Sequence, residues 1–152
     1  MSSTRVYLAG LISTEKPESL QWRVFAAKRL EQAGLKPISP MRGKEQLALE
    51  SKDGGVSSTI RTPKDIMLRD YLDVEGSDVI LMHLESFGST RPLLGTIVEL
   101  GWAWQLRKPL VAVAAADNYL MRNHPFVKEA VSHMFETLEE AVDYVTSYYK
   151  RP

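Results

Sequence analysis

Val79-Ile80-Leu81-Met82-His83-Leu84 is the most strand-like run of the chain, because aliphatic and β-branched residues dominate it without a break. A continuous apolar run of this length is typical of a strand that is buried on both faces of a parallel sheet. Ser77-Asp78 precedes the run and ends the connection that leads into it. We therefore expect a central strand at residues 79–84.

A helix is predicted on each side of this strand. The first begins at Thr62-Pro63-Lys64-Asp65, where the proline suits the first turn, and runs to about Glu75. The second covers residues 95–106 and is followed by Arg107 and Lys108, cations that favour the negative end of a helix dipole. This order of elements indicates parallel βαβ units.

The other expected strands are short apolar runs, and the other helices have an apolar period of three to four residues. The strands are expected at 5–10, 35–39, 109–114 and 134–135, the helices at 20–33, 124–131 and 137–149, and a loop at 117–123. Strands that alternate with helices predict an α/β fold. We expect one domain over residues 1–152, a doubly wound, flavodoxin- or Rossmann-like parallel sheet of five strands with helices on both faces.

Residues 40–63 form a long polar connection that includes Asp53-Gly54-Gly55 and Ser57-Ser58-Thr59. Connections of this length are uncommon in a compact domain unless they act as a lid or a binding loop. The sequence therefore predicts a lid at residues 41–63.

Charge and composition favour a small-molecule ligand. Lys and Arg together number 19, as do Asp and Glu, so the chain has no net field to attract nucleic acid or a membrane surface. There is no cysteine, which excludes disulfides and thiolate metal sites. No apolar run is typical of a signal peptide or a membrane span, so a cytoplasmic location is expected.

Candidate site residues follow the strands, because open α/β sheets bind ligands beyond the carboxyl ends of their strands. They lie at 7–13, 41–44, 65–70, 85–99 and 114–124. Gly10-Leu11-Ile12-Ser13 lacks the G-x-G-x-x-G of dinucleotide sites, and the chain has no Walker A sequence and no G-x-S-x-G elbow. His83, His124 and His133 are too dispersed for a metal motif, so we expect packed or capping histidines, no metal and no cofactor.

Glu99 has two interpretations. In Thr96-Ile97-Val98-Glu99, Thr96 as the N-cap residue would make Glu99 the partner in a capping box, which needs no function. Alternatively, Glu99 in the first turn is kept ionised by the helix dipole and acts as a nucleophile. Gly101 favours the second interpretation. A glycine inside a helix lowers the stability of the helix by about 1 kcal/mol relative to alanine, a cost that is easier to understand if another group must approach closely there.

Glycosyl transfer by such a nucleophile needs a second carboxyl group as proton donor. Asp65, Asp73 and Glu75 share one predicted helix, and each is expected to be an N-terminal charge or part of a solvated face. Asp70, next to Arg69, remains open as the proton donor.

Several motifs occur in an order and at spacings that resemble one enzyme family. They are Arg69-Asp70-Tyr71-Leu72-Asp73-Val74, Ser77-Asp78-Val79-Ile80-Leu81 and Gly95-Thr96-Ile97-Val98-Glu99-Leu100-Gly101-Trp102-Ala103. With Val6-Tyr7-Leu8-Ala9-Gly10 and Thr137-Leu138-Glu139-Glu140-Ala141 near the ends, the chain resembles the nucleoside 2-deoxyribosyltransferase family along nearly its whole length. Ser39-Pro40-Met41-Arg42-Gly43-Lys44 and His124-Pro125-Phe126-Val127 look like one subgroup of it.

The resemblance implies a retaining, two-step transfer of 2-deoxyribose between nucleobases. It implies that Glu99 attacks C1′ of a deoxynucleoside to form a glycosyl ester, that Asp70 moves a proton to and from the base, and that the Tyr7 hydroxyl orients the nucleophile. The expected substrate-binding residues are Gly10, Ser13, Met41, Arg42 and Gly95.

The resemblance also implies a homo-oligomer whose neighbouring subunit helps to close the site. Large side chains are expected partly in the core and partly at such an interface. They are Trp22, Trp102, Trp104, Tyr148 and Tyr149.

One departure from the family keeps a second activity open. Well-known members carry an acidic residue six places before the nucleophile, where this chain has Leu93. Related enzymes of the same fold hydrolyse nucleoside 5′-monophosphates, and such an enzyme must hold a phosphate dianion. The candidates for that contact are Ser13, Lys16, Arg23, Arg42 and Lys44, although Lys16, Arg23 and Lys44 are otherwise expected on the solvated surface. A third interpretation is a nucleotide-sensing module without turnover.

Overall fold

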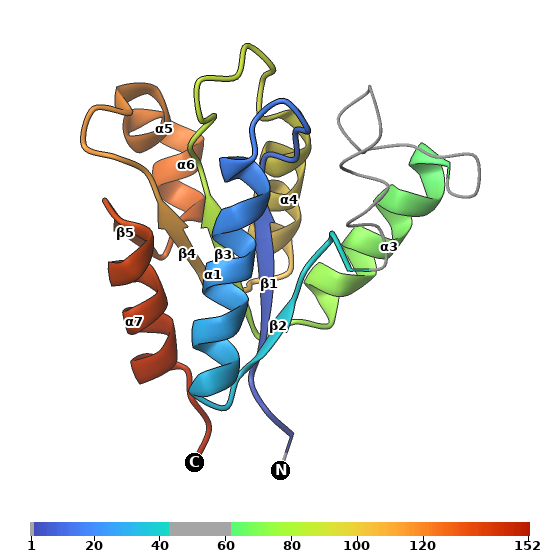
Figure 1. Ribbon diagram of the computed structural model, residues 1–152, viewed down its shortest axis with the longest axis vertical. Helices are drawn as coiled ribbons and strands as arrows, with labels where there is room; N and C mark the ends of the chain where they lie inside the picture. The colour runs from blue at the N-terminus through green and yellow to red at the C-terminus, as the bar shows by residue number, and fades with distance from the viewer. Residues whose placement is uncertain (1, 43–61) are drawn as a thin grey trace.

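A parallel sheet of five strands forms the centre of the computed structural model, which describes residues 2–42 and 62–152 (Figure 1). The strands are β1 (Arg5–Gly10), β2 (Lys36–Ile38), β3 (Val79–His83), β4 (Leu110–Val113) and β5 (His133–Phe135). Their order across the sheet is β2-β1-β3-β4-β5, and every neighbouring pair is parallel. The predicted doubly wound α/β class and the central position of the 79–84 strand are both confirmed.

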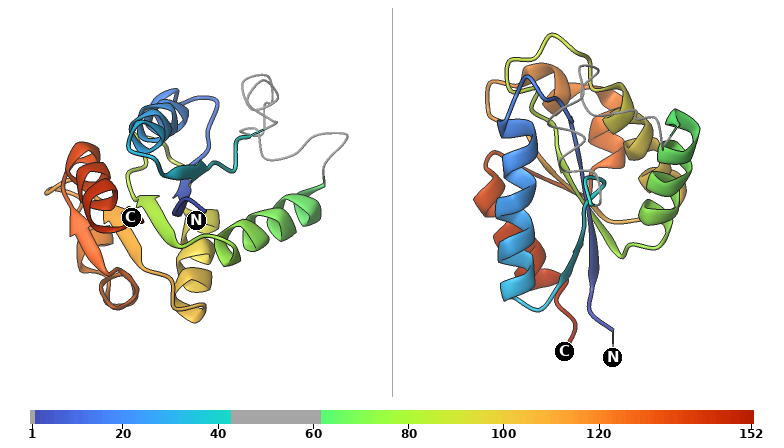
Figure 2. Two further views of the ribbon diagram at one scale, coloured as in Figure 1. Left: turned by 90° about the horizontal axis from the view of Figure 1, so that it is seen from below. Right: turned by 45° about the vertical axis from the view of Figure 1, so that its right-hand side comes forward.

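Helices cover both faces of the sheet, as Figure 2 shows from two further sides. Helices α1 (Glu18–Gln32) and α7 (Leu138–Tyr148) pack on one face, and α3 (Pro63–Glu75), α4 (Leu94–Gln105) and α6 (Pro125–Ala130) pack on the other. A short helix, α5 (Tyr119–Asn123), precedes α6. In the described part of the chain no helix is long and apolar enough to cross a membrane.

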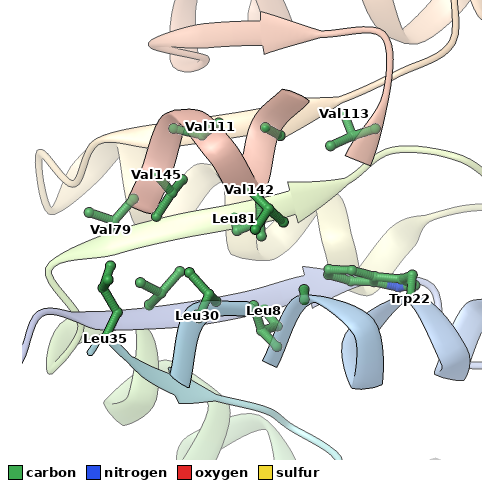
Figure 3. Packing of buried hydrophobic residues seen from close by; sticks show 13 residues of the cluster. Leu8, Trp22, Leu30, Leu35, Val79, Leu81, Val111, Val113, Val142 and Val145 are labelled. Atoms are coloured by element: carbon green, nitrogen blue, oxygen red, sulfur yellow. The ribbon is translucent and has the colours of Figure 1, made fainter. Parts of the chain in front are cut away.

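Alternation along each strand divides the core into two layers. Leu8 and Leu81 face α1 and α7, where they meet Leu30 and Val142 in the first layer (Figure 3). Tyr7 and the other alternate residues point to the opposite layer, under α3 and α4. Because successive side chains of a strand point to opposite faces, neighbours in sequence are separated by the whole sheet.

The sheet changes its direction of growth between β1 and β3. From β1 the chain passes through α1 to β2 on one side, and then crosses the other face through α3 to reach β3 on the opposite side of β1. Ligands of doubly wound sheets bind in the crevice at such a switch point, beyond the carboxyl ends of the strands. The fold therefore directs attention to the residues that follow β1 and β3.

Helix boundaries follow local capping. The Thr62 hydroxyl accepts a hydrogen bond from the Asp65 amide in a capping box, with Pro63 in the first turn as predicted. The Thr137 hydroxyl accepts one from the Glu140 amide at the start of α7. The predicted loop at 117–123 is wrong in part, because the Asn118 side chain accepts a hydrogen bond from the Met121 amide and starts α5. The predicted lid at 41–63 falls mainly on residues 43–61, which lie outside the described residues.

Candidate active site

A cavity of about 320 Å³ opens at the carboxyl edge of the sheet, beside β1. Its walls come from the segment after β1, the start of α3, the segment before α4, and α4 itself, and α3 and α4 stand side by side in Figures 1 and 2. The lining is mostly apolar and includes Leu11, Pro92, Leu93 and Trp102. A cavity of this size and character is typical of a small-molecule site, for which roughly 300–1,000 Å³ is usual.

Glu99 and Asp70 face this cavity from two different helices. Glu99 comes from α4 and Asp70 from α3, and an edge-on contact between Tyr71 and Trp102, with ring centroids 5.3 Å apart, holds the two helices together. Two carboxyl groups that are 29 positions apart in the sequence therefore share one apolar cavity. The arrangement contains the pair of groups that acid-assisted glycosyl transfer requires.

Tyr7 contacts Glu99 from the sheet. Its side chain is fully buried on the face of β1 that α4 covers, and its hydroxyl donates a hydrogen bond to Glu99 Oε2. Burial, followed by the charges of Glu99 and Asp70, raises the pKa of Tyr7 well above its usual value, so the hydroxyl stays protonated and remains a donor. The bond holds the Glu99 carboxylate in one orientation.

The capping-box interpretation of Glu99 is wrong. Helix α4 begins at Leu94, one residue before the predicted start, and its N-cap residue Leu93 offers no side-chain hydrogen bond. Thr96 therefore lies within the first turn and Glu99 in the second, where the side chain is 8% exposed. The dipole argument weakens as well, because the effect of a helix terminus falls off within one turn. Other groups must stabilise the charge of Glu99.

Gly101 does not accommodate a close neighbour within the described chain. It is exposed on α4, and a Cβ placed there meets no atom within 4 Å among the described residues. The predicted reason for this glycine therefore has no counterpart inside the described part of one chain.

The five predicted substrate-binding residues separate into two groups. Gly10 and Gly95 line the cavity. Ser13, Met41 and Arg42 are not among the described lining residues. The buried Ser13 hydroxyl accepts a hydrogen bond from the Glu15 amide, and Met41 is also buried.

Gly10 is a glycine because other parts of the protein come close to it. A Cβ at this position would lie 3.1 Å from the His83 carbonyl oxygen and 3.1 Å from Trp22 Cζ2. The predicted reason was the approach of substrate, but the close approach comes from β3 and α1.

Arg42 pairs with a carboxylate that was expected to be solvated. Asp73 is only 8% exposed, and Arg42 donates to its two carboxylate oxygens at 2.7 and 2.8 Å. This hydrogen-bonded contact raises the pKa of Arg42. Arg69 reinforces the contact by donating to the Arg42 carbonyl oxygen at 2.8 Å. These bonds tie the end of the 39–42 segment to α3.

Arg23 lies in a different environment from the one that the sequence predicted. It was expected on the solvated surface or at a phosphate, but its side chain is 3% exposed, and it donates to the carbonyl oxygens of Leu8, Gly10, Leu11 and Ser19. A signal for its burial exists in the sequence, because positions 19, 23, 26 and 30 recur at helical spacing along the buried stripe of α1.

His83 lies at the end of β3, packed between aromatic rings. Its ring centroid lies 5.2 Å from that of Trp22 and 4.9 Å from that of Phe87, and its Nδ1 accepts a hydrogen bond from the Glu85 amide. Burial, and then the charge of Arg23, lowers the pKa of His83 to about 4. The expectation of a packed histidine agrees with this environment. Within residues 2–42 and 62–152 no group of three or more His, Asp or Glu could hold a metal ion.

Comparison with known proteins finds a family model that matches most of the chain. The sequence model described as nucleoside 2-deoxyribosyltransferase matches residues 6–142. A comparison with curated protein sequences finds no match.

Solved structures share the fold at low sequence identity. The 2-deoxyribosyltransferase from Bacillus psychrosaccharolyticus is 16% identical, with a TM-score of 0.67 over 93% of this chain and 92% of its own. The 2-deoxyribosyltransferase from Leishmania mexicana is 17% identical, with a TM-score of 0.66 over 96% of this chain and 99% of its own. The CMP N-glycosidase BcmB from Clostridium botulinum is 18% identical, with a TM-score of 0.60 over 95% of this chain and 100% of its own.

The environment of His83 predicts a loss of stability in acid. The folded-state pKa of about 4 lies below the usual 6.5, so the unfolded chain binds more protons between these values, and the free energy of unfolding falls as the pH is lowered through that window. The contribution of His83 is about 3 kcal/mol. Urea denaturation at a series of pH values should show a smaller acid loss in His83→Asn, which keeps an acceptor near Nδ1. The same substitution at the exposed His133 should reproduce the wild-type pH dependence; equal acid losses in both variants and wild type would contradict the assignment.

Proposed function

Because the chain belongs to the nucleoside 2-deoxyribosyltransferase family, we propose that it transfers 2-deoxyribose between nucleobases by a retaining double displacement. The observation that carries this proposal is the hydrogen bond from the buried Tyr7 hydroxyl to Glu99 in a cavity that Asp70 also lines. A carboxylate held in one orientation inside an apolar cavity is suited to covalent catalysis.

In the first step, Glu99 attacks C1′ of a deoxynucleoside as the bond between C1′ and the base nitrogen breaks. Protonated Asp70 gives its proton to the base, which takes the bonding electrons and leaves as a neutral molecule. Tyr7 donates to Oε2, which leaves Oε1 of Glu99 to form the glycosyl ester.

In the second step, an incoming base attacks C1′ from the face that the first base left. The ester bond breaks and its electrons return to Glu99 as a carboxylate, while Asp70 accepts the proton of the incoming base. Two inversions at C1′ give net retention. Tyr7 keeps its proton throughout, because its raised pKa disfavours the phenolate.

A second candidate function is the hydrolysis of a nucleoside 5′-monophosphate. Leu93 in place of the acidic residue, and the fold shared with a CMP N-glycosidase, favour it. The bonds of two predicted phosphate contacts favour transfer from an uncharged nucleoside, because Arg23 is bonded to backbone carbonyls and Arg42 to Asp73. Arg91, which was not predicted as a phosphate contact, is the one basic residue among the described lining residues. Lys44 lies outside the described residues.

A homo-oligomer is part of the proposal. The outer face of α4 exposes four large apolar side chains next to the cavity, which would be costly to leave in water. They are Leu94, Ile97, Val98 and Trp104. Gly101 lies on the same helix with open space above it, so a second copy of the chain can approach the backbone there.

Substitution of Glu99 tests its role as the nucleophile. Glu99→Gln keeps the shape and an oxygen that accepts the Tyr7 hydrogen bond but removes the negative charge, so base exchange should fall by at least about 10³-fold. The assay mixes a deoxynucleoside with a second base and measures the new nucleoside by chromatography. Mass spectrometry of wild-type enzyme quenched during turnover should find a deoxyribosyl group on Glu99.

Glu75→Gln, on the exposed end of α3, is the matched control and should keep wild-type exchange. Free base and sugar as the only products under excess acceptor would reject transfer. Faster cleavage of the matching 5′-monophosphate would select the hydrolase instead.

Substitution of Asp70 tests its role as the proton donor. Asp70→Asn cannot donate a carboxyl proton, so rates should fall most for bases that leave poorly, by about 10²–10⁴-fold. Bases that leave easily need little protonation and should lose much less. Rates measured for a series of deoxynucleosides test this, and an equal loss for every base would leave Asp70 only a positioning role.

The mass of the protein in solution tests the proposed homo-oligomer. Light scattering of the purified protein should give a mass larger than that of one chain, and Trp104→Arg should lower it by placing a charge on the outer face of α4. Val24→Arg changes another exposed apolar residue, on α1 at the opposite face of the sheet, and should leave the mass unchanged. A monomeric wild-type protein would reject the oligomer.

A further inference from the structure

Arg23 carries a charge in the interior that is not neutralised by an ion pair within the described residues. The side chain is 3% exposed, and no carboxylate oxygen of residues 2–42 or 62–152 forms a salt bridge with it. A buried charge is costly unless hydrogen bonds satisfy it. Here the guanidinium is satisfied by backbone carbonyls instead of a carboxylate, so its net positive charge is retained inside the protein.

Two of the four carbonyl groups belong to residues that line the cavity. Arg23 Nη2 donates to Gly10 at 2.7 Å, Nη1 donates to Leu11 at 3.1 Å and to Ser19 at 2.7 Å, and Nε donates to Leu8 at 3.3 Å. Gly10 and Leu11 line the cavity. A single planar side chain therefore joins the end of β1, the segment after it and the start of α1.

The charge of Arg23 also acts on the carboxyl groups of the site. Burial lowers the pKa of Arg23 to about 10, so it is protonated at neutral pH, and electrostatic interactions with Tyr7, Glu99 and Asp70 oppose that lowering. These interactions are reciprocal, so the guanidinium favours the ionised form of Glu99. The neighbouring His83 has its pKa lowered to about 4 and contributes no charge at neutral pH.

A nearby positive group favours the ionised form of Glu99. Glu99 lies in the second turn of α4, beyond the reach of the helix terminus, and most of the cavity wall around it is apolar. Tyr7 from β1 bonds to Glu99, while Asp70 from α3 and Arg91 from the segment before α4 line the same cavity. Arg23 interacts with Glu99 electrostatically from α1, on the other side of the sheet. Tyr7 supplies a hydrogen bond without charge, and Asp70 supplies a like charge when it is ionised.

We propose that Arg23 is a positioning residue of the active site, which holds the cavity wall at Gly10 and Leu11 through its carbonyl bonds and favours the ionised nucleophile Glu99 through its buried charge. The inference rests on the proposed function for its effect on catalysis. It assigns no contact between Arg23 and the substrate, because Gly10 and Leu11 lie between them.

The test of the charge is Arg23→Met, which fills a similar volume without charge or donors. The acid limb of the pH profile of kcat/KM should move to higher pH, because Glu99 loses a positive neighbour. Arg29→Met is the matched control, since Arg29 lies on the same helix and pairs with Asp143 on the surface. An acid limb that stays at its wild-type position in folded Arg23→Met overturns the electrostatic part of the inference.

The test of the carbonyl bonds is Arg23→Lys, which keeps the charge but replaces a planar fork with a single ammonium group. The acid limb should stay near its wild-type position, and kcat/KM should fall by about 10²-fold because the cavity wall is displaced. Nuclear magnetic resonance should show shifted amide signals at Gly10 and Leu11. Wild-type kcat/KM and unshifted amide signals overturn the positioning part, and this variant decides the inference if Arg23→Met does not fold.

A readout without turnover separates this inference from the proposed function. The carboxyl carbon of Glu99, assigned by its disappearance in Glu99→Gln, is titrated by nuclear magnetic resonance in wild type and in Arg23→Met. A titration that moves to higher pH in the variant supports the inference even if no deoxynucleoside reacts, an outcome that would reject the proposed function alone. An unmoved titration overturns the inference even if base exchange is observed.

Discussion

The hydrogen bond from Tyr7 to Glu99 is the contact on which the candidate site depends. Tyr7 belongs to a central strand and Glu99 to a helix that covers it, so the bond crosses the interface between sheet and helix. It forms because alternation along β1 sends Tyr7 toward α4 while its neighbours Val6 and Leu8 face α1 and α7. A carboxylate that is bonded in this way has its orientation set by the core of the protein rather than by a surface loop.

Charge reaches the same carboxylate from the opposite side of the sheet. Arg23 lies on α1 and is held by the carbonyl groups at the end of β1, where the sheet changes its direction of growth. That switch point therefore supplies both the crevice for a ligand and the backbone that anchors the cation. Mostly apolar walls strengthen each of these electrostatic interactions, because they lower the local dielectric constant.

The same architecture is compatible with more than one reaction of the N-glycosidic bond. Deoxyribosyltransferases and a CMP N-glycosidase share this fold with the chain at 16–18% identity, so the fold alone does not distinguish the two reactions. Leu93, just before α4, is the wall position where the resemblance to well-known transferases predicts an acidic residue. With leucine at that place, Asp70 and Glu99 are the acidic groups among the described lining residues.

The sequence by itself determined the parallel α/β class, the central strand at 79–84 and the start of α3 at Thr62-Pro63, because hydrophobic period and helix-start signals are local properties of the chain. It also indicated Glu99, Asp70 and Tyr7 through the family resemblance that their motifs carry. Only the tertiary structure decided that Glu99 does not cap its helix, that Asp73 pairs with Arg42 and that Arg23 is buried, since the partners of each come from distant segments. Such contacts depend on which strand and helix meet at the carboxyl edge, and local sequence patterns do not carry that information.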